Sequence, residues 1–143
     1  MLAREIMSSK LEKIGFNATI CEAAEKMRLA DIGFLPVERA GKIVGIVTDR
    51  DIVVRAIAYH LNPDTTAVGK VMTSDVVYCY DNDDLEEAEE IMEEKQIRRL
   101  VVLNNDDMPV GVLSLSDFVT KAKDENLACR AMGKICESVG SKW

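Results

Sequence analysis

The chain repeats itself, and this repeat limits the possible fold more than any other feature of the sequence. A shift of 65 residues aligns the first part of the chain with the second, and from Val44 onward the shift becomes 66. The added residue falls within 104–107, an Asn-Asn-Asp-Asp stretch that is typical of a surface turn. We therefore expect two repeats, over 4–58 and 69–123, with a linker at 59–68. The aligned pairs include Met7 and Met72, Glu22 and Glu87, Met27 and Met92, Leu35 and Leu100, Gly45 and Gly111, and Asp51 and Asp117.

Each repeat shows the same order of patterns, namely a strand, a helix, two strands joined by a turn, and a second helix. Thr19 followed by Glu22 predicts a capping box in the first repeat, and Asp84 takes the cap position in the second. We expect a mixed α/β (α+β) fold of two β-α-β-β-α units. The tail 124–143 adds a C-terminal helix over about Glu125–Ser138. The expected strands are 11–15, 34–38, 43–47, 76–80, 100–103 and 109–113.

Composition excludes several classes of protein. The 143 residues are 48% hydrophobic, too apolar for a disordered chain, and no run approaches the roughly 18 apolar residues of a membrane span. A net charge of −7 and an aromatic content of 5% argue against nucleic acid as a partner. The N-terminus lacks the apolar core of a signal peptide, so we expect a cytoplasmic protein. The four cysteines form no CxxC pair and His60 is the single histidine, so we expect no metal site.

A dense acidic run lies on the predicted first helix of the second repeat. It could bind cations or a basic partner, but a solvated helix face is the simpler interpretation. The acids are Asp81, Asp83, Asp84, Glu86, Glu87, Glu89, Glu90, Glu93 and Glu94.

A short motif that could bind a ligand runs from the last strand of each repeat into the following helix. It reads Gly-Ile-Val-Thr-Asp-Arg-Asp at 45–51 and Gly-Val-Leu-Ser-Leu-Ser-Asp at 111–117. Thr48 and Ser114 take the helix N-cap, where unpaired N–H groups can bind phosphate. Asp51 and Asp117 could accept hydrogen bonds from two ribose hydroxyls. The same spacing is also an ordinary cap that stabilises by about 1 kcal/mol. Recurrence in register supports a nucleoside phosphate site, and the capping interpretation stays open.

This doubled unit, with the motif at the last strand–helix junction, closely resembles the cystathionine β-synthase (CBS) domain. Further matching pieces are Ile6-Met7-Ser8, Val71-Met72-Thr73, 31–37 and 96–102, so the resemblance covers nearly all of 4–123. The chain looks like a stand-alone CBS pair, also called a Bateman module. The resemblance implies two repeats packed through their sheets with pseudo-twofold symmetry, leaving two clefts. It implies an adenosine ligand (AMP, ADP, ATP, NAD or S-adenosylmethionine), a flat homodimer and a regulatory role without catalysis.

The resemblance also implies roles for single residues. Thr48 matches the phosphate-contacting hydroxyl and Asp51 the ribose-contacting acid, and Ser114 and Asp117 match these roles in the second repeat. Arg50 adds charge near the phosphates, where the second repeat has Ser116. Arg98 and Arg99 replace Gly33 and Phe34, so one arginine could reach a polyphosphate. Val101 replaces Pro36, so the second repeat matches the pattern less well. The candidate ligand-binding residues are Gly33, Thr48, Arg50, Asp51, Arg99, Ser114 and Asp117.

Two functional hypotheses remain at this stage. The first is a sensor that binds an adenosine ligand and acts in trans on an unidentified effector protein. The alternative is a nucleotide-independent or thiol-based, redox-responsive interaction protein. Cys129 and Cys136 share a face of the tail helix about 10 Å apart, too far to bridge each other, although an intermolecular bridge is open. Packing of these thiols against the module is the simpler interpretation. An enzyme is not expected, since His60 lies outside the motif.

Overall fold

The computed structural model describes residues 1–136, which divide into two compact units with exchanged ends. One unit is Glu12–Val76, hereafter the first-repeat unit. The other joins Met1–Leu11 to the chain from Val77 onward, hereafter the second-repeat unit. The N-terminal segment therefore packs with the second repeat, although it precedes the first in sequence. The compact units differ in this respect from the repeats at 4–58 and 69–123.

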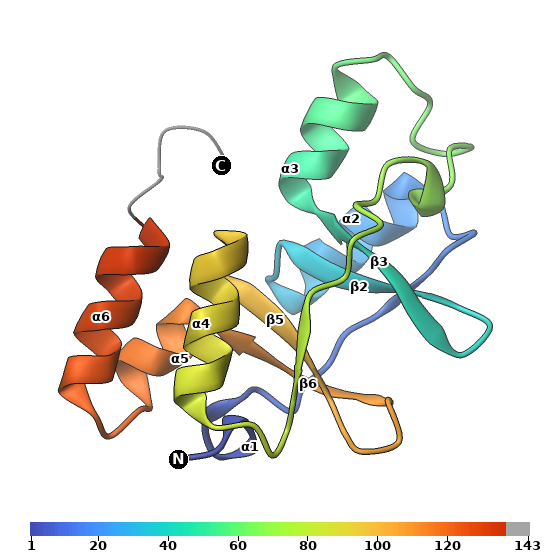
Figure 1. The fold of residues 1–143 in the computed structure, drawn as a ribbon. Helices are drawn as coiled ribbons and strands as arrows, with labels where there is room; N and C mark the ends of the chain where they lie inside the picture. Colours follow the sequence, from blue (N-terminus) through green and yellow to red (C-terminus); the bar gives the residue numbers. More distant parts are fainter. Residues whose placement is uncertain (137–143) are drawn as a thin grey trace. The chain divides into compact units, whose positions relative to one another are not determined.

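The first-repeat unit is built on a three-stranded sheet in the order β1-β2-β3, drawn in blue to cyan in Figure 1. Strand β1 runs parallel to β2, and β2 pairs antiparallel with β3. Its elements are β1 (Ile14–Gly15), α2 (Ile20–Ala30), β2 (Phe34–Arg39), β3 (Lys42–Thr48), α3 (Asp49–Asp51), the π-helix η1 (Ile52–Ile57) and the 3-10 helix η2 (Val68–Lys70).

The second-repeat unit repeats this arrangement with the sheet order β4-β5-β6. Strand β4 is parallel to β5, and β5 is antiparallel to β6. The β-α-β-β-α order expected from the sequence is thus confirmed in both units. The elements are α1 (Ala3–Ile6), β4 (Tyr78–Tyr80), α4 (Leu85–Lys95), β5 (Arg99–Leu103), β6 (Pro109–Ser114), α5 (Leu115–Thr120) and α6 (Glu125–Cys136).

The helix starts follow the sequence closely, whereas the first strands are shorter than expected. Thr19 Oγ1 accepts the Glu22 N–H at 3.1 Å, and Glu22 Oε2 accepts the Thr19 N–H at 2.8 Å, so the predicted capping box is present. Strands β1 and β4 begin at Ile14 and Tyr78 rather than at 11 and 76. The chain passes from one unit to the other just before each strand. Val77, directly before β4, still accepts a hydrogen bond from the Val101 N–H at 3.4 Å.

The C-terminal helix α6 is present and packs on α4 and α5 (Figure 1). Its Leu127, Ala131 and Ile135 are buried in the core of the second-repeat unit. The Arg130 guanidinium lies 3.2 Å from Glu89 Oε2, and this contact explains why Glu89 is only 2% exposed. The interpretation of the acidic run as a solvated face is therefore wrong for Glu89. It is confirmed for the exposed residues Glu86, Glu87, Glu90 and Glu94.

The cysteines differ in their surroundings. Cys21, Cys79 and Cys129 carry free thiols, and burial raises the pKa of Cys79 to about 12, so this thiol stays protonated and unreactive. Cys129 is exposed, which contradicts the expected packing of this thiol against the module. The side chain of Cys136 lies outside the described residues. Within residues 1–136 no helix combines the length and hydrophobicity needed to cross a bilayer.

The first residues of each repeat pack in the unit of the other repeat, and they lie against the motif glycines Gly111 and Gly45. Ser8 and Val112 exchange backbone hydrogen bonds of 2.9 and 3.0 Å beside Gly111. A Cβ atom on Gly111 would lie 2.7 Å from the Ser8 carbonyl oxygen. Gly45 has the same relation to Thr73, whose carbonyl oxygen would lie 2.8 Å from a Cβ. The first residue of each motif therefore has a packing role of its own.

We predict that Gly111→Ala destabilises the protein by about 1–3 kcal/mol, because the added methyl group pushes against a backbone carbonyl that cannot rotate away. The measurement is a chemical denaturation curve, with limited proteolysis to detect release of residues 1–11. Gly15→Ala is the control, since a Cβ there has no atom within 4 Å. Equal stability of the two variants would contradict the prediction.

Candidate functional site

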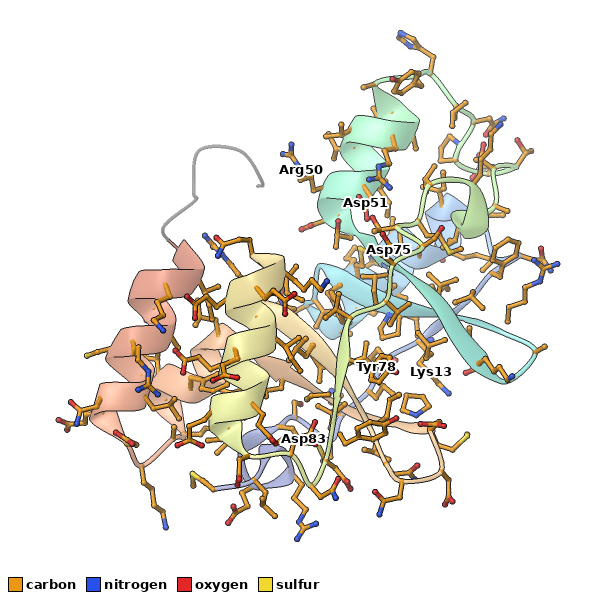
Figure 2. All side chains as sticks on the ribbon, viewed as in Figure 1. Lys13, Arg50, Asp51, Asp75, Tyr78 and Asp83 are labelled. Carbon is orange, nitrogen blue, oxygen red and sulfur yellow. The ribbon has the colours of Figure 1, made fainter. Side chains whose placement is uncertain are left out.

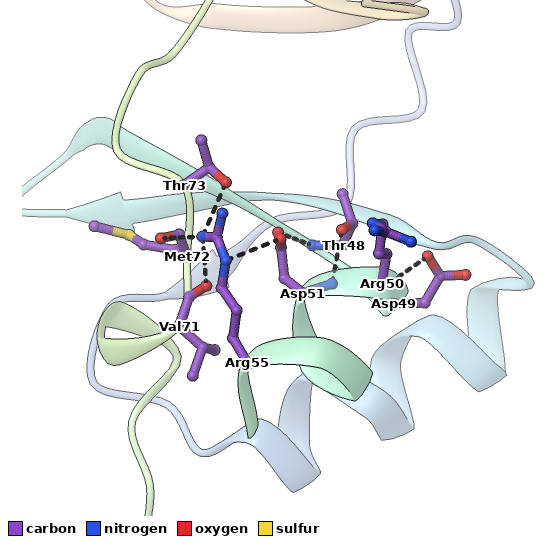
Figure 3. Close-up of polar contacts among 8 residues, drawn as sticks. All are labelled: Thr48, Asp49, Arg50, Asp51, Arg55, Val71, Met72 and Thr73. Carbon is purple, nitrogen blue, oxygen red and sulfur yellow. Dashed lines mark hydrogen bonds and ion pairs between the residues drawn. The ribbon is translucent and has the colours of Figure 1, made fainter. Parts of the chain in front are cut away.

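The motif of the first-repeat unit forms a reciprocal cap between the end of β3 and the start of α3 (Figure 3). The Thr48 N–H donates to Asp51 Oδ2 at 3.0 Å, and the Asp51 N–H donates to Thr48 Oγ1 at 3.1 Å. The capping interpretation is thus confirmed as a structural role. A hydroxyl can donate as well as accept, so the Thr48 O–H can still donate to a ligand.

The first N–H groups of this helix have partners within the unit. The Asp49 N–H donates to the Gly33 carbonyl at 3.0 Å, and the Arg50 N–H donates to Asp49 Oδ1 at 2.9 Å. With the Asp51 N–H bound to Thr48, these three backbone donors are already used. A phosphate here would therefore depend on the Thr48 hydroxyl and the Arg50 side chain rather than on open backbone donors.

Arg55 connects this cap to the chain segment that follows η2. Its Nε lies 3.8 Å from Asp51 Oδ1. Its Nη1 lies 3.2 Å from the carbonyl oxygens of Val71 and Met72 and from Thr73 Oγ1 (Figure 3). Figure 3 also shows that Asp51 faces Arg55, whereas Arg50 lies on the side of Asp49. The side chain of Asp51 is 13% exposed, so most of it is buried and part of it reaches the surface.

The second-repeat unit uses the same framework with different contacts. The Ser114 N–H donates to Asp117 Oδ2 at 2.8 Å, and the Ser114 hydroxyl donates to the same oxygen at 2.7 Å. Lys121 Nζ lies 2.8 Å from Asp117 Oδ1 and 3.3 Å from the Ile6 carbonyl oxygen. Lys121 thus occupies the place that Arg55 has in the first repeat, and Ile6 corresponds to Val71.

The structure gathers the candidate residues into two groups, one in each unit. Gly33 lies against the Asp49 carboxylate, and Arg50 is exposed at the helix start (Figure 2). Arg99 is exposed at the start of β5, where the register pairs it with Ser114. The first group holds Gly33, Thr48, Arg50 and Asp51, and the second holds Arg99, Ser114 and Asp117.

Sequence reasoning missed the two bases, Arg55 and Lys121. Each stands four residues after the motif aspartate, and this is the spacing of a helical ion pair. The recurrence of a base at this position in both repeats was visible in the sequence. It also missed the contacts of Thr73 and Ile6, which depend on the exchange of segments between the units.

Residues 1–136 contain no group of three or more His, Cys, Asp or Glu side chains arranged to hold a metal ion. Zinc or a similar ion needs several such ligands around one point.

Relatives of known sequence and structure match most of the chain. Hypoxic response protein 1 of Mycobacterium tuberculosis is 34% identical over 117 residues, 81% of each chain. A crystal structure of Hypoxic Response Protein I with two coordinated zinc ions matches with a TM-score of 0.73 and 33% identity, covering 83% of this chain and 97% of that one. The CBS domain-containing protein YhcV of Bacillus subtilis is 32% identical over 132 residues, 92% of this chain and 93% of its own.

A further solved structure contains ligands. The CBS domain pair of protein MJ0100, in complex with 5′-methylthioadenosine and S-adenosyl-L-methionine, matches with a TM-score of 0.72 and 25% identity, covering 83% of this chain and 93% of that one. The family model of the CBS domain matches twice, at residues 3–57 and 68–124. With two matched domains, each carrying the Gly-x-x-Thr/Ser-x-x-Asp motif in the same structural position, the chain belongs to the CBS domain family as a tandem pair.

Proposed function

We propose that this CBS pair is a regulatory module that binds an adenosine-containing ligand at the Thr48–Asp51 group and signals to a partner protein. CBS domain pairs are regulatory modules, and the MJ0100 pair was solved with two adenosine compounds. The ligand candidates are AMP, ADP, ATP, NAD and S-adenosylmethionine. The protein acts as a sensor rather than as an enzyme.

The observation that carries this proposal is the carboxylate of Asp51, which has few close donors. Among the described residues, one backbone N–H donates to it, and its basic neighbour Arg55 is at 3.8 Å. A carboxylate has about four acceptor positions, so the two hydroxyls of a ribose can both be accommodated. The Thr48 hydroxyl lies beside the Asp51 carboxylate and can donate a hydrogen bond to a ligand.

We predict that Asp51→Asn weakens binding of the adenosine ligand by roughly ten- to a hundredfold, because a charged acceptor of ribose hydroxyls is lost. Asparagine keeps an oxygen for the Thr48 N–H, so the cap is preserved. Isothermal titration calorimetry with the five candidate ligands measures the change. Asp117→Asn should have a smaller effect, and Glu25→Ala, which removes an exposed acid of the same unit, should have none. Equal affinities of wild type and Asp51→Asn would exclude this site.

The charge at the start of α3 favours ligands with few phosphates. Asp49 is exposed and its carboxylate binds the Arg50 N–H, where a phosphate oxygen would otherwise bind. The second repeat has Leu115 at this position. The exposed Asp49 carboxylate beside Arg50 repels a polyphosphate and tolerates a neutral or cationic tail. AMP and S-adenosylmethionine therefore fit this group better than ATP.

We predict that Asp49→Asn raises the affinity for ATP by roughly three- to tenfold and leaves that for S-adenosylmethionine equal or lower, because removing one charge relieves repulsion of the phosphates. Titrations of both ligands at two salt concentrations test this, since screening should shrink the difference. Asp31→Asn, at the C-terminal cap of α2, is the control. A parallel change for both ligands would contradict the charge argument.

Assembly is the second part of the proposal, and the π-helix η1 supplies the surface. Val53, Val54 and Ile57 are 58%, 43% and 51% exposed, an apolar ridge on one short helix. Val119, which matches Val53 in the second repeat, is 48% exposed. An apolar ridge can pair with its own copy across a twofold axis, and burying it removes an unfavourable contact with water. We propose a homodimer that uses this ridge.

We predict that the double variant Val53→Glu/Ile57→Glu is monomeric, whereas wild type is dimeric at tens of micromolar in reductant. Charges placed on both copies of the ridge repel and lose apolar burial. Light scattering coupled to size exclusion gives the mass, and Met108→Glu on the β5–β6 turn is the control. A wild-type dimer that is lost only in reductant would instead support the thiol-based alternative through Cys129.

A further inference from the structure

The two motif carboxylates have different neighbours, although the sequence motif is shared. Asp117 receives three close donors, two from Ser114 on Oδ2 and one from Lys121 on Oδ1. Asp51 receives one backbone donor within the described residues, and its nearest base lies 1 Å further away than Lys121 lies from Asp117 (3.8 against 2.8 Å). Three of roughly four acceptor positions are thus used at Asp117.

The Lys121 contact is short, although the lysine side chain is about half exposed. An ammonium at 2.8 Å from a carboxylate oxygen is a charge-assisted hydrogen bond, about twice as strong as a neutral one. The carbonyl oxygen of Ile6, at 3.3 Å, holds the same ammonium from the other side. The side chains of Asp117 and Asp51 are 10% and 13% exposed, so the two carboxylates are about equally shielded from water and differ mainly in their donors. Lys121 lies four residues after Asp117 on the same chain, so a ligand must compete with a permanently tethered cation.

The hydroxyl of the second repeat is also used within the unit. Ser114 Oγ donates to Asp117 Oδ2 at 2.7 Å and lies 2.8 Å from Ser116 Oγ. Thr48 Oγ1 instead accepts from a backbone N–H, so its O–H can still donate to a ligand. Both groups that the first repeat offers to a ligand are therefore engaged internally in the second.

We propose that the Lys121 ammonium binds the Asp117 carboxylate in place of a ligand, so that the chain binds one adenosine ligand rather than two. This inference rests on the proposed function, because it concerns the same type of site. Lys121 acts through Asp117 and determines which repeat responds to the ligand. The second repeat then has a structural role, in which the Lys121 ammonium fastens the N-terminal segment at Ile6.

The experiment counts binding sites by calorimetry on the full chain, with AMP, ADP, ATP, NAD and S-adenosylmethionine as the probes. Wild type should bind one molecule per chain. Lys121→Met should bind two, because removal of the ammonium leaves Asp117 Oδ1 open, with the second affinity within roughly tenfold of the first. The gained site should not bind 2′,3′-dideoxyadenosine monophosphate, which lacks the ribose hydroxyls.

Two matched variants complete the design. Arg55→Met removes the equivalent base of the first repeat and should leave the count at one, since Arg55 does not block Asp51. Lys121→Gln repeats the test with a polar side chain, should the methionine variant melt at a much lower temperature. Lys121 is 47% exposed, so both variants are expected to fold.

Each outcome has a defined meaning. Two sites in wild type, or one site in wild type and still one in both Lys121 variants, would overturn this inference and leave the proposed function intact. No binding to wild type but one site in Lys121→Met would support the inference and overturn the assignment of the ligand to Asp51. No binding to any variant would overturn both proposals.

Discussion

One carboxylate in each unit joins three parts of the chain that are otherwise separate. Asp51 caps the helix that follows β3 and faces Arg55, which in turn binds the carbonyl oxygens of Val71 and Met72. Asp117 does the same through Lys121 and the Ile6 carbonyl. Each half-exposed ion pair is worth at most about 1 kcal/mol alone. Each ion pair nevertheless holds the chain segment that also packs against the motif glycine of the same unit.

Much of the fold could be predicted from the sequence because its signals are local. The order of elements follows from apolar periodicity, and the start of α2 follows from Thr19 and Glu22 three residues apart. The exchange of ends could not be predicted in this way. The pattern of residues 1–11 is compatible with packing on either repeat, and contacts such as Ser8 with Val112 join residues that are far apart in sequence. Glu89 also reads as a surface acid until α6 is placed over it.

In the candidate site, too, the local features could be predicted from the sequence and those that depend on distant contacts could not. The pairing of Thr48 with Asp51 follows from their spacing at a strand–helix junction, and the bases Arg55 and Lys121 follow from a four-residue interval. The direction of the hydroxyl could not be predicted, since Thr48 accepts a hydrogen bond where Ser114 donates one. The difference between 3.8 and 2.8 Å in the two ion pairs depends on side-chain conformation and on the carbonyl groups that hold each base.

A carboxylate that caps a helix and also recognises a ligand has two conflicting tasks. Every donor that the fold supplies makes the cap firmer and removes an acceptor position from the ligand. In Asp51 one oxygen serves the cap, and a guanidinium that is held by three other acceptors stays at a distance from the second oxygen. In Asp117 both oxygens are used by the fold. Two repeats with one motif therefore differ in how many acceptor positions the fold leaves open at the carboxylate.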